Sequence, residues 1–101
     1  MKFYKLVRDK VPSVLRDKGK IPIIHFADEK EYWEKLKEKL REEVNEFLEN
    51  EKEEELVDIL EVIYAICDFK RIKRKELELI RKRKKEKRGG FKDGVILEEV
   101  K

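Results

Sequence analysis

Residues 28–69 decide the fold, and they read DEKEYWEKLKEKLREEVNEFLENEKEEELVDILEVIYAICDF. The first half of this stretch places apolar residues three or four positions apart, which is the spacing of one face of an α-helix. They are Trp33, Leu36, Leu40, Val44, Phe47 and Leu48. Asp28 is a good N-cap residue, and Glu31 follows three positions later as its capping-box partner. We therefore predict a long helix from about Glu29 to Asn50.

A second helix is predicted from about Lys52 to Phe69. Its apolar residues cover most of the circumference, so this helix should be central and have neighbours on more than one side. A short charged link joins it to the first helix, which predicts an antiparallel hairpin. Cys67 sits in the apolar stretch of the second helix, where we expect its thiol to be inert core.

A third helix is predicted from about Arg74 to Lys87. Its apolar stripe is thin, with Leu77 and Ile80, and its second half is strongly basic. Gly89 and Gly90 end it.

Short elements flank these helices. Pro12 marks a helix start in the basic N-terminal segment, and Gly19 ends that element. Residues 21–26 read as extended, with Pro22 indicating an edge position, and residues 94–97 would form a short strand that pairs with them.

The predicted fold class is mostly all-α, in one domain of residues 1–101. A helical hairpin packs with a third helix, and short extended segments lie near the termini.

Composition excludes several classes of protein. Half of the residues are charged, yet the net charge is only +3, so bulk charge does not argue for a nucleic-acid binder. No apolar run approaches the roughly 20 residues of a membrane span, and residues 1–5 lack the apolar run of a signal peptide. We therefore expect a cytoplasmic protein without a membrane partner.

The scarce residue types exclude further chemistry. Ser13 and His25 are the single serine and histidine, and neither has the surroundings of a nucleophile in a catalytic triad. The chain offers no cluster of cysteine and histidine for zinc. Carboxylates remain in quantity, and they suit hard cations such as Mg²⁺.

Four carboxylates occupy informative positions. Glu43 and Glu46 lie on the flank of the apolar stripe of the first helix, whereas Glu55 and Asp58 lie within or beside the apolar arc of the second. Acids at i and i+3 face one way on a helix. Two such pairs across a hairpin would surround one cavity, where their mutual repulsion calls for one or two Mg²⁺ ions. The alternative is that all four are salt-bridged surface residues of a helix rich in lysine and glutamate.

Two motifs carry a family resemblance. Glu42-Glu43-Val44-Asn45-Glu46 and Glu55-Leu56-Val57-Asp58 resemble the EExxE and ExxD motifs of the all-α nucleoside triphosphate pyrophosphatases. This is the MazG-like superfamily, which includes dimeric dUTPases and phosphoribosyl-ATP pyrophosphohydrolase. Residues 5–12 and 88–91 are similar to a compact subgroup regarded as house-cleaning enzymes for noncanonical nucleotides.

The resemblance implies an activity and a metal site. The activity is hydrolysis of a nucleoside triphosphate to a nucleoside monophosphate and pyrophosphate. The implied Mg²⁺ ligands are Glu43, Glu46, Glu55 and Asp58. Glu42 and Glu46 are the candidates for a general base that takes a proton from the attacking water. Residues 47–54 form a shorter connection between the motifs than many relatives have, so little room is left for an insertion that recognises the base.

Basic residues are candidates for holding the phosphates. One face of the third helix carries Arg81, Lys84, Lys85 and Arg88, and it can bind phosphate or simply be solvated. A second candidate clamp near the N-terminus consists of Lys5, Arg8 and Lys10. Two rival functions stay open: a phosphoribosyl-ATP pyrophosphohydrolase, and a non-catalytic helical module that binds nucleic acid through the third helix.

The protein is expected to be a homo-oligomer, either a dimer or a tetramer. The second helix is apolar on more sides than a short chain can readily cover. Helix pairs from two chains commonly complete a four-helix bundle, and members of the superfamily assemble as dimers or larger. A partner chain would then be able to lend basic residues of its third helix to the site.

Overall fold

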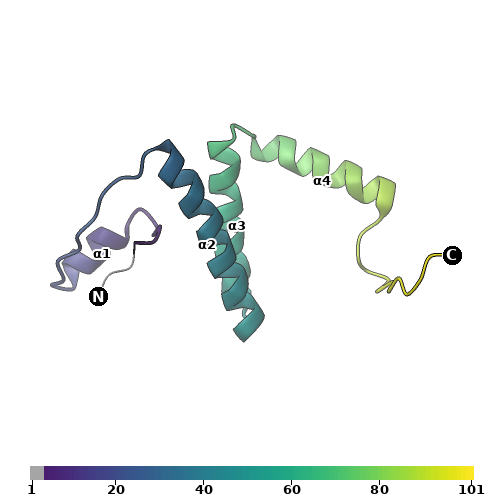
Figure 1. The fold of residues 1–101 in the computed structure, drawn as a ribbon, viewed down its shortest axis with the longest axis horizontal. Coiled ribbons are helices and arrows are strands. Elements are labelled where there is room, and N and C mark those ends of the chain that lie inside the picture. The colour runs from purple at the N-terminus through teal and green to yellow at the C-terminus, as the bar shows by residue number, and fades with distance from the viewer. Residues whose placement is uncertain (1–3) are drawn as a thin grey trace.

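The computed structural model describes residues 4–101, and residues 1–3 of the N-terminal stretch considered above lie outside the described part. Within residues 4–101 the chain forms four helices and no strand (Figure 1). They are α1 (Val11–Asp17), α2 (Glu29–Asn50), α3 (Glu53–Phe69) and α4 (Arg74–Arg88). The predicted helical fold class is confirmed, and so are the three long helices, whose ends differ by at most one residue from those predicted.

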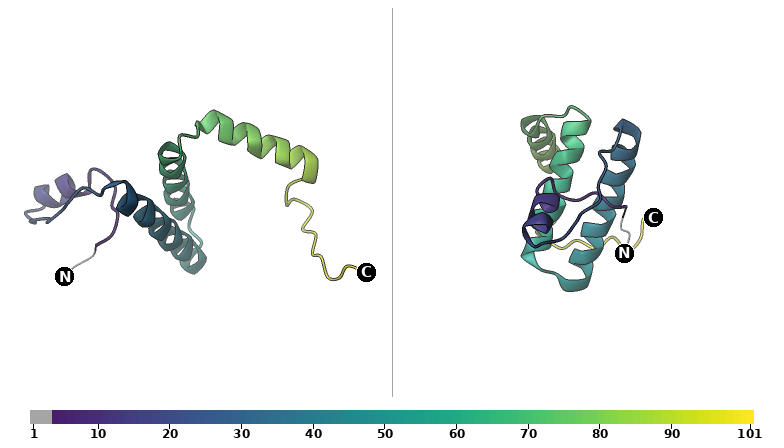
Figure 2. Two further views of the ribbon diagram at one scale, coloured as in Figure 1. Left: turned by 45° about the horizontal axis from the view of Figure 1, so that its top comes forward. Right: turned by 90° about the vertical axis from the view of Figure 1, so that its left-hand side faces the viewer.

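Helices α2 and α3 lie side by side as an antiparallel hairpin (Figures 1 and 2). The Asp28 side chain caps α2 by accepting a hydrogen bond of 2.8 Å from the Glu31 backbone N–H, as predicted. At the turn Glu51 adopts a left-handed conformation (φ 56°). The Asn50 side chain then accepts a hydrogen bond of 3.0 Å from the Lys52 backbone N–H, immediately before α3 begins. Local hydrogen bonds therefore fix both the start of α2 and the reversal of the chain.

The hydrophobic core is small and lies between α2 and α3. Leu36 is 1 % exposed, and Val62 and Cys67 are also buried, so Cys67 is core as predicted. At the end of the hairpin opposite the turn, the Trp33 ring stacks on Phe69 with centroids 5.0 Å apart. Apolar packing therefore extends along the interface between α2 and α3, and the stacked rings hold the two helices together at the end opposite the turn.

Helix α4 does not pack alongside the hairpin, so that part of the predicted fold is wrong. It leaves the end of α3 and projects away from it (Figures 1 and 2). The Arg74 guanidinium lies 4.1 Å from the centroid of the Tyr64 ring and ties the first residue of α4 to α3. Beyond that contact Leu79 and Ile80 are about half exposed. Helix α4 has three apolar residues among many Lys and Arg, which is too little apolar surface to hold it against the hairpin.

The predicted strands near Ile23 and Ile96 are absent from the described part of the chain. Residues 20–28 are irregular and link α1 to α2, and residues 94–101 trail from the C-terminal end. Ile23 and Ile96 are 96 % and 81 % exposed, so neither segment packs on the hairpin. The two segments lie at opposite ends of the molecule (Figure 1), which prevents the expected pairing.

The chain is too extended to bury the apolar surface it carries. Its radius of gyration is 18.0 Å, whereas a compact domain of this length would have about 13 Å. Its accessible surface is 9897 Å², against about 6,100 Å² for a compact chain of the same mass. Part of the excess is apolar, because Leu56, Val57 and Leu60 of α3 are all exposed by 46–62 %.

Measured against the length and hydropathy that a bilayer requires, none of the helices within residues 4–101 qualifies as a membrane span.

Leu36→Ala should lower the free energy of unfolding by about 2–5 kcal/mol, because it leaves a cavity at the most deeply buried side chain of the hairpin. Urea denaturation at a fixed protein concentration measures the change. Leu97→Ala is the matched control, since Leu97 is 77 % exposed and its truncation should cost about 0.5 kcal/mol or less. Equal effects of the two substitutions would contradict this description of the core.

Candidate functional site

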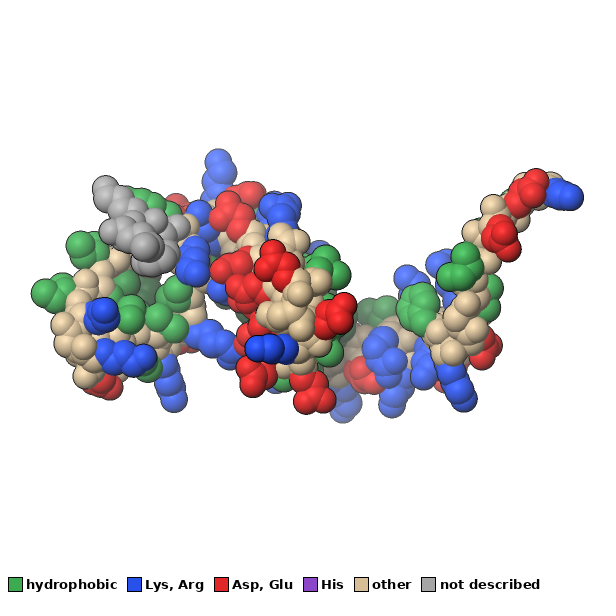
Figure 3. Space-filling model, turned by 90° about the horizontal axis from the view of Figure 1, so that it is seen from below, with side chains coloured by type: hydrophobic (Ala, Val, Ile, Leu, Met, Phe, Trp, Pro, Cys, Tyr) green, Lys and Arg blue, Asp and Glu red, His purple; other side chains and the backbone are tan. Residues whose placement is uncertain are grey.

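The acidic residues of the two motifs converge where α2 faces α3. Carboxylate oxygens of Glu43, Glu55 and Asp58 lie within 4.8 Å of one another, and so do those of Glu42, Glu43 and Glu46. Glu43 belongs to both groups and therefore joins them into one acidic cluster. The structure thus brings together all four predicted metal ligands, with Glu42 beside them. Figure 3 shows acidic side chains gathered over the central hairpin.

Glu43 is the most unusual member of this acidic cluster. Its side chain is 8 % exposed, and one carboxylate oxygen, Oε1, lies 3.1 Å from the Lys39 ammonium nitrogen. The other oxygen, Oε2, is fully buried and has no hydrogen-bond partner within the described part of the chain. A buried carboxylate oxygen without a partner is costly. The neighbouring donors are all carboxylate oxygens, and this donor set fits a hard divalent cation such as Mg²⁺.

Glu46 experiences the repulsion within the acidic cluster most strongly. Burial, the charge and hydrogen bond of Glu43, and then those of Glu55 raise the pKa of Glu46 to about 7. Near neutral pH and without a cation, the Glu46 carboxyl is therefore about half protonated.

Basic residues from the N-terminal segment reach the edge of the acidic cluster. The Arg8 guanidinium lies 2.7 Å from Asp58 Oδ1, and the Lys5 ammonium nitrogen lies 3.3 Å from Glu42 Oε1. Arg8 is therefore adjacent to the acids, as a phosphate clamp would need to be. Lys10 occupies the N-cap position of α1 and makes no ion pair with the acids within residues 4–101.

Sequence reasoning missed Lys39, which lies within the acidic cluster. Its ammonium nitrogen is 3.2 Å from Glu42 and 3.1 Å from Glu43. The signal was its position four residues before Glu43, which places both on one face of the helix. Helix α2 contains many such pairs of lysine and glutamate, so spacing did not distinguish this one.

Helix α4 carries its basic residues away from the acidic cluster. Arg81 is bound to Glu78 on the same helix at 2.6 Å, and Lys84 and Arg88 line an exposed hollow together with Ile80. Within one chain, the structure therefore does not bring Arg81, Lys84 and Arg88 to the acids, because α4 projects away from the hairpin (Figure 2).

Comparisons with known proteins add a short stretch of similarity. The chain matches no model of a known protein family and no solved structure. It is 45 % identical over 42 residues to an uncharacterized protein of Mycolicibacterium smegmatis. The aligned stretch covers 42 % of this chain and 43 % of that protein. The resemblance to the MazG-like superfamily therefore continues to rest on the motifs and stays a prediction.

Without divalent cations, the free energy of unfolding should fall as the pH rises from about 4.5 to about 7. The pKa of Glu46 is about 7 in the folded chain and close to 4.5 when unfolded, so the folded state binds more protons across this range and loses that advantage as they dissociate. Urea denaturation with a chelator present measures the slope.

Glu46→Gln is the control for this pH dependence, because it removes the titrating group and keeps the shape. The variant should show a flatter decline over the same range. The same slope in both proteins would contradict the assignment of the raised pKa to Glu46.

Proposed function

We propose that this protein is a Mg²⁺-dependent nucleoside triphosphate pyrophosphohydrolase of the MazG-like type, with noncanonical nucleotides among its substrates. The observation that carries the proposal is the convergence of Glu43, Glu46, Glu55 and Asp58 across the hairpin, together with the buried Oε2 of Glu43, which has no hydrogen-bond partner within residues 4–101. Surface acids in a charged helix would have no reason to bury that oxygen without a partner. The salt-bridge alternative accounts for Lys39 and Arg8 but leaves this atom unexplained.

The reaction separates the α-phosphate from the diphosphate. The oxygen of a water molecule bonds to the α-phosphorus, and the bond from that phosphorus to the α,β-bridging oxygen breaks. The bridging oxygen keeps the electron pair and leaves with pyrophosphate, and the proton of the water passes to a carboxylate. Bound Mg²⁺ would supply positive charge that neutralises the phosphate oxygens.

Glu46 is the better of the two candidate general bases. Without a bound cation the pKa of Glu46 is raised to about 7, and a carboxylate that keeps part of this shift beside Mg²⁺ can accept a proton near neutral pH. Burial would raise the pKa of Glu42, but the hydrogen bonds and charges of Lys39 and then Lys5 lower it overall. Glu42 is therefore the weaker base, and we assign it to holding the two lysines in place.

A homo-oligomer completes this proposal. The excess accessible surface and the exposed Leu56, Val57 and Leu60 of α3 favour a second copy covering that helix. Charge complementarity favours it too, because the basic half of α4 carries the opposite sign to the acidic hairpin. A partner's α4 would then supply Arg81, Lys84 and Arg88 to acids that the chain's own α4 does not approach.

Nucleic-acid binding by α4 is the rival function that a specific observation favours. The helix projects from the hairpin, and Arg83, Lys84 and Lys87 lie on its exposed surface. A binding module of this kind would lose affinity steeply with added salt, and its affinity would not depend on the acids.

A screen of canonical and modified nucleoside triphosphates with Mg²⁺, detecting pyrophosphate, tests the activity itself. Phosphoribosyl-ATP belongs in the same screen, since its hydrolysis would identify the rival pyrophosphohydrolase. Pyrophosphate release from at least one nucleoside triphosphate supports the proposal. No release from any of them, together with salt-dependent binding of nucleic acid, would replace it with the rival.

Asp58→Asn should lower turnover at least about 100-fold and weaken Mg²⁺ binding, because the amide removes a negative charge from the acidic cluster. Steady-state kinetics and titration calorimetry measure the two effects, and circular dichroism should show unchanged helices. Asp68→Asn, at an exposed position on the same helix, is the matched control. Equal activity of the two variants would remove Asp58 from the site.

Mixing an Asp58→Asn chain with an Arg88→Ala chain should restore part of the activity if α4 acts on the partner's acids. Each mixed oligomer would then contain one site with intact acids and an intact α4, about a quarter of the wild-type sites in a random dimer. Light scattering on the same samples gives the oligomeric state. A stable, active monomer at micromolar concentration would contradict both the proposed oligomer and the proposed shared site.

A further inference from the structure

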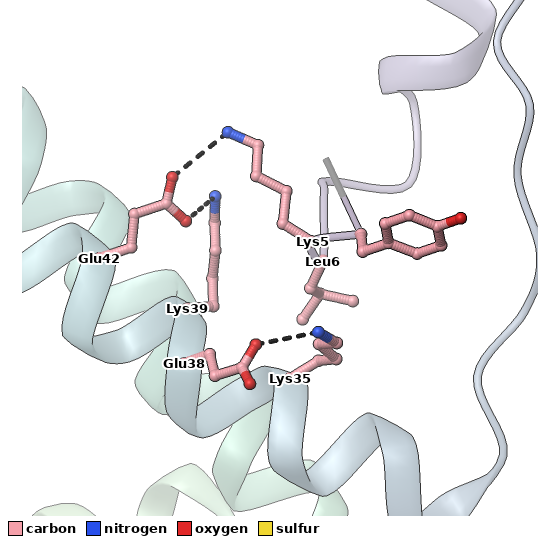
Figure 4. Close-up of a pocket in the computed structure, with 7 residues that line it drawn as sticks. Lys5, Leu6, Lys35, Glu38, Lys39 and Glu42 are labelled. Carbon is pink, nitrogen blue, oxygen red and sulfur yellow. Dashed lines mark hydrogen bonds and ion pairs between the residues drawn. The ribbon is translucent and has the colours of Figure 1, made fainter. Parts of the chain in front are cut away.

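A cavity of about 420 Å³ lies beside the acidic cluster, between α2 and the N-terminal segment. Figure 4 shows its labelled walls, with Lys5 and Leu6 on one side and the α2 residues on the other. Its lining consists of Tyr4, Lys5, Leu6, Lys35, Glu38, Lys39 and Glu42. Lys5 is the single predicted phosphate ligand among these residues, and none of the four predicted metal ligands lines the cavity.

Three ammonium groups and two carboxylates surround this lysine cavity, so its lining is cationic overall. The Lys5 and Lys39 ammonium nitrogens both lie against Glu42, at 3.3 and 3.2 Å. The Lys35 ammonium nitrogen lies 3.1 Å from Glu38. The side chains of Lys39 and Lys35 are only 17 % and 25 % exposed. Lysines usually keep their charge in water, so mostly buried ammonium groups in a lining with one more cation than anion favour an anionic occupant.

The lysine cavity adjoins the acidic cluster at Glu42. Glu42 lines the cavity, and one of its oxygens lies within 4.8 Å of oxygens of Glu43 and Glu46. Lys39 bridges the same boundary, since it contacts both Glu42 and Glu43. An anion held by a cation at the acidic cluster would therefore lie beside Lys39 at the edge of the cavity.

We propose that the lysine cavity binds the β,γ-diphosphate end of the substrate and receives pyrophosphate after cleavage. This inference rests on the proposed function and specifies how the substrate is oriented in the site. The diphosphate is the most highly charged and compact part of the substrate, and lysine binds phosphate as a point charge. The α-phosphate then faces the acidic cluster, and the nucleoside lies on the side of the acids away from Lys35.

Lys35 is the most informative residue for a test. It lies on the cavity wall, and its ion-pair partner, Glu38, is exposed and three residues away on the same helix. Losing such a pair costs little stability. Lys35→Gln should therefore leave the fold intact and remove one phosphate contact, whereas changes at Lys39 would also disturb Glu43. Lys30→Gln, at an exposed position of α2, is the matched control.

Titration calorimetry of the full chain with pyrophosphate, at constant Mg²⁺, is the primary measurement. Lys35→Gln should weaken pyrophosphate binding about tenfold, which is the loss expected for one charge-assisted hydrogen bond. Lys35→Arg should restore most of the affinity because it keeps the charge. Lys30→Gln should bind as the wild type does, and a nucleoside monophosphate should bind equally to all four proteins.

Two outcomes would overturn the inference. Equal pyrophosphate affinity in Lys35→Gln and Lys30→Gln would show that the cavity does not hold the diphosphate. A loss of affinity for the monophosphate, with pyrophosphate unaffected, would place the nucleoside in the cavity instead.

The inference and the proposed function can fail separately. Binding of pyrophosphate that depends on Lys35, without hydrolysis of any nucleoside triphosphate, would end the proposed function and keep the cavity as a diphosphate site. Hydrolysis with pyrophosphate binding that ignores Lys35 would keep the enzyme and end the assignment of the cavity.

Discussion

The buried carboxylate of Glu43 is the constraint on which the rest of the site depends. It sits in the α2–α3 interface, where apolar residues would contribute more stability, and one of its oxygens has no partner within residues 4–101. Lys39 compensates for the other oxygen. A chain that keeps a half-compensated charge in so small a core gives up stability there, which is characteristic of residues retained for binding or chemistry.

The other charged residues surround Glu43, with acids next to it and basic residues of the N-terminal segment further out. Glu46, Glu55 and Asp58 place more negative charge beside it, and the raised pKa of Glu46 is the consequence. Arg8 and Lys5 then approach from the N-terminal segment and balance the outer acids. Those basic side chains are more exposed than Lys39, so they can exchange a carboxylate for a phosphate at little cost.

The extended shape has the same physical origin as the site. A hairpin whose inner face contains carboxylates has less apolar area left for internal packing, and α4 contributes almost none. The exposed apolar residues of α3 and the projecting basic helix are what remain uncovered. Both features favour association, the first through apolar burial and the second through attraction to an acidic hairpin.

The sequence by itself determined the helices, because helical periodicity, the Asp28 cap and the glycines after Arg88 are local signals. It also indicated that the acids could meet, since each i, i+3 pair shares one face of its helix and lies within or beside the apolar residues that pack between the helices. Only the tertiary structure decided which acid is buried from solvent, which lysine pairs with that acid, and in which direction α4 projects. Those outcomes depend on how much apolar area each helix face buries against the neighbouring helix. In a chain rich in lysine and glutamate, the spacing of residues does not reveal that buried area.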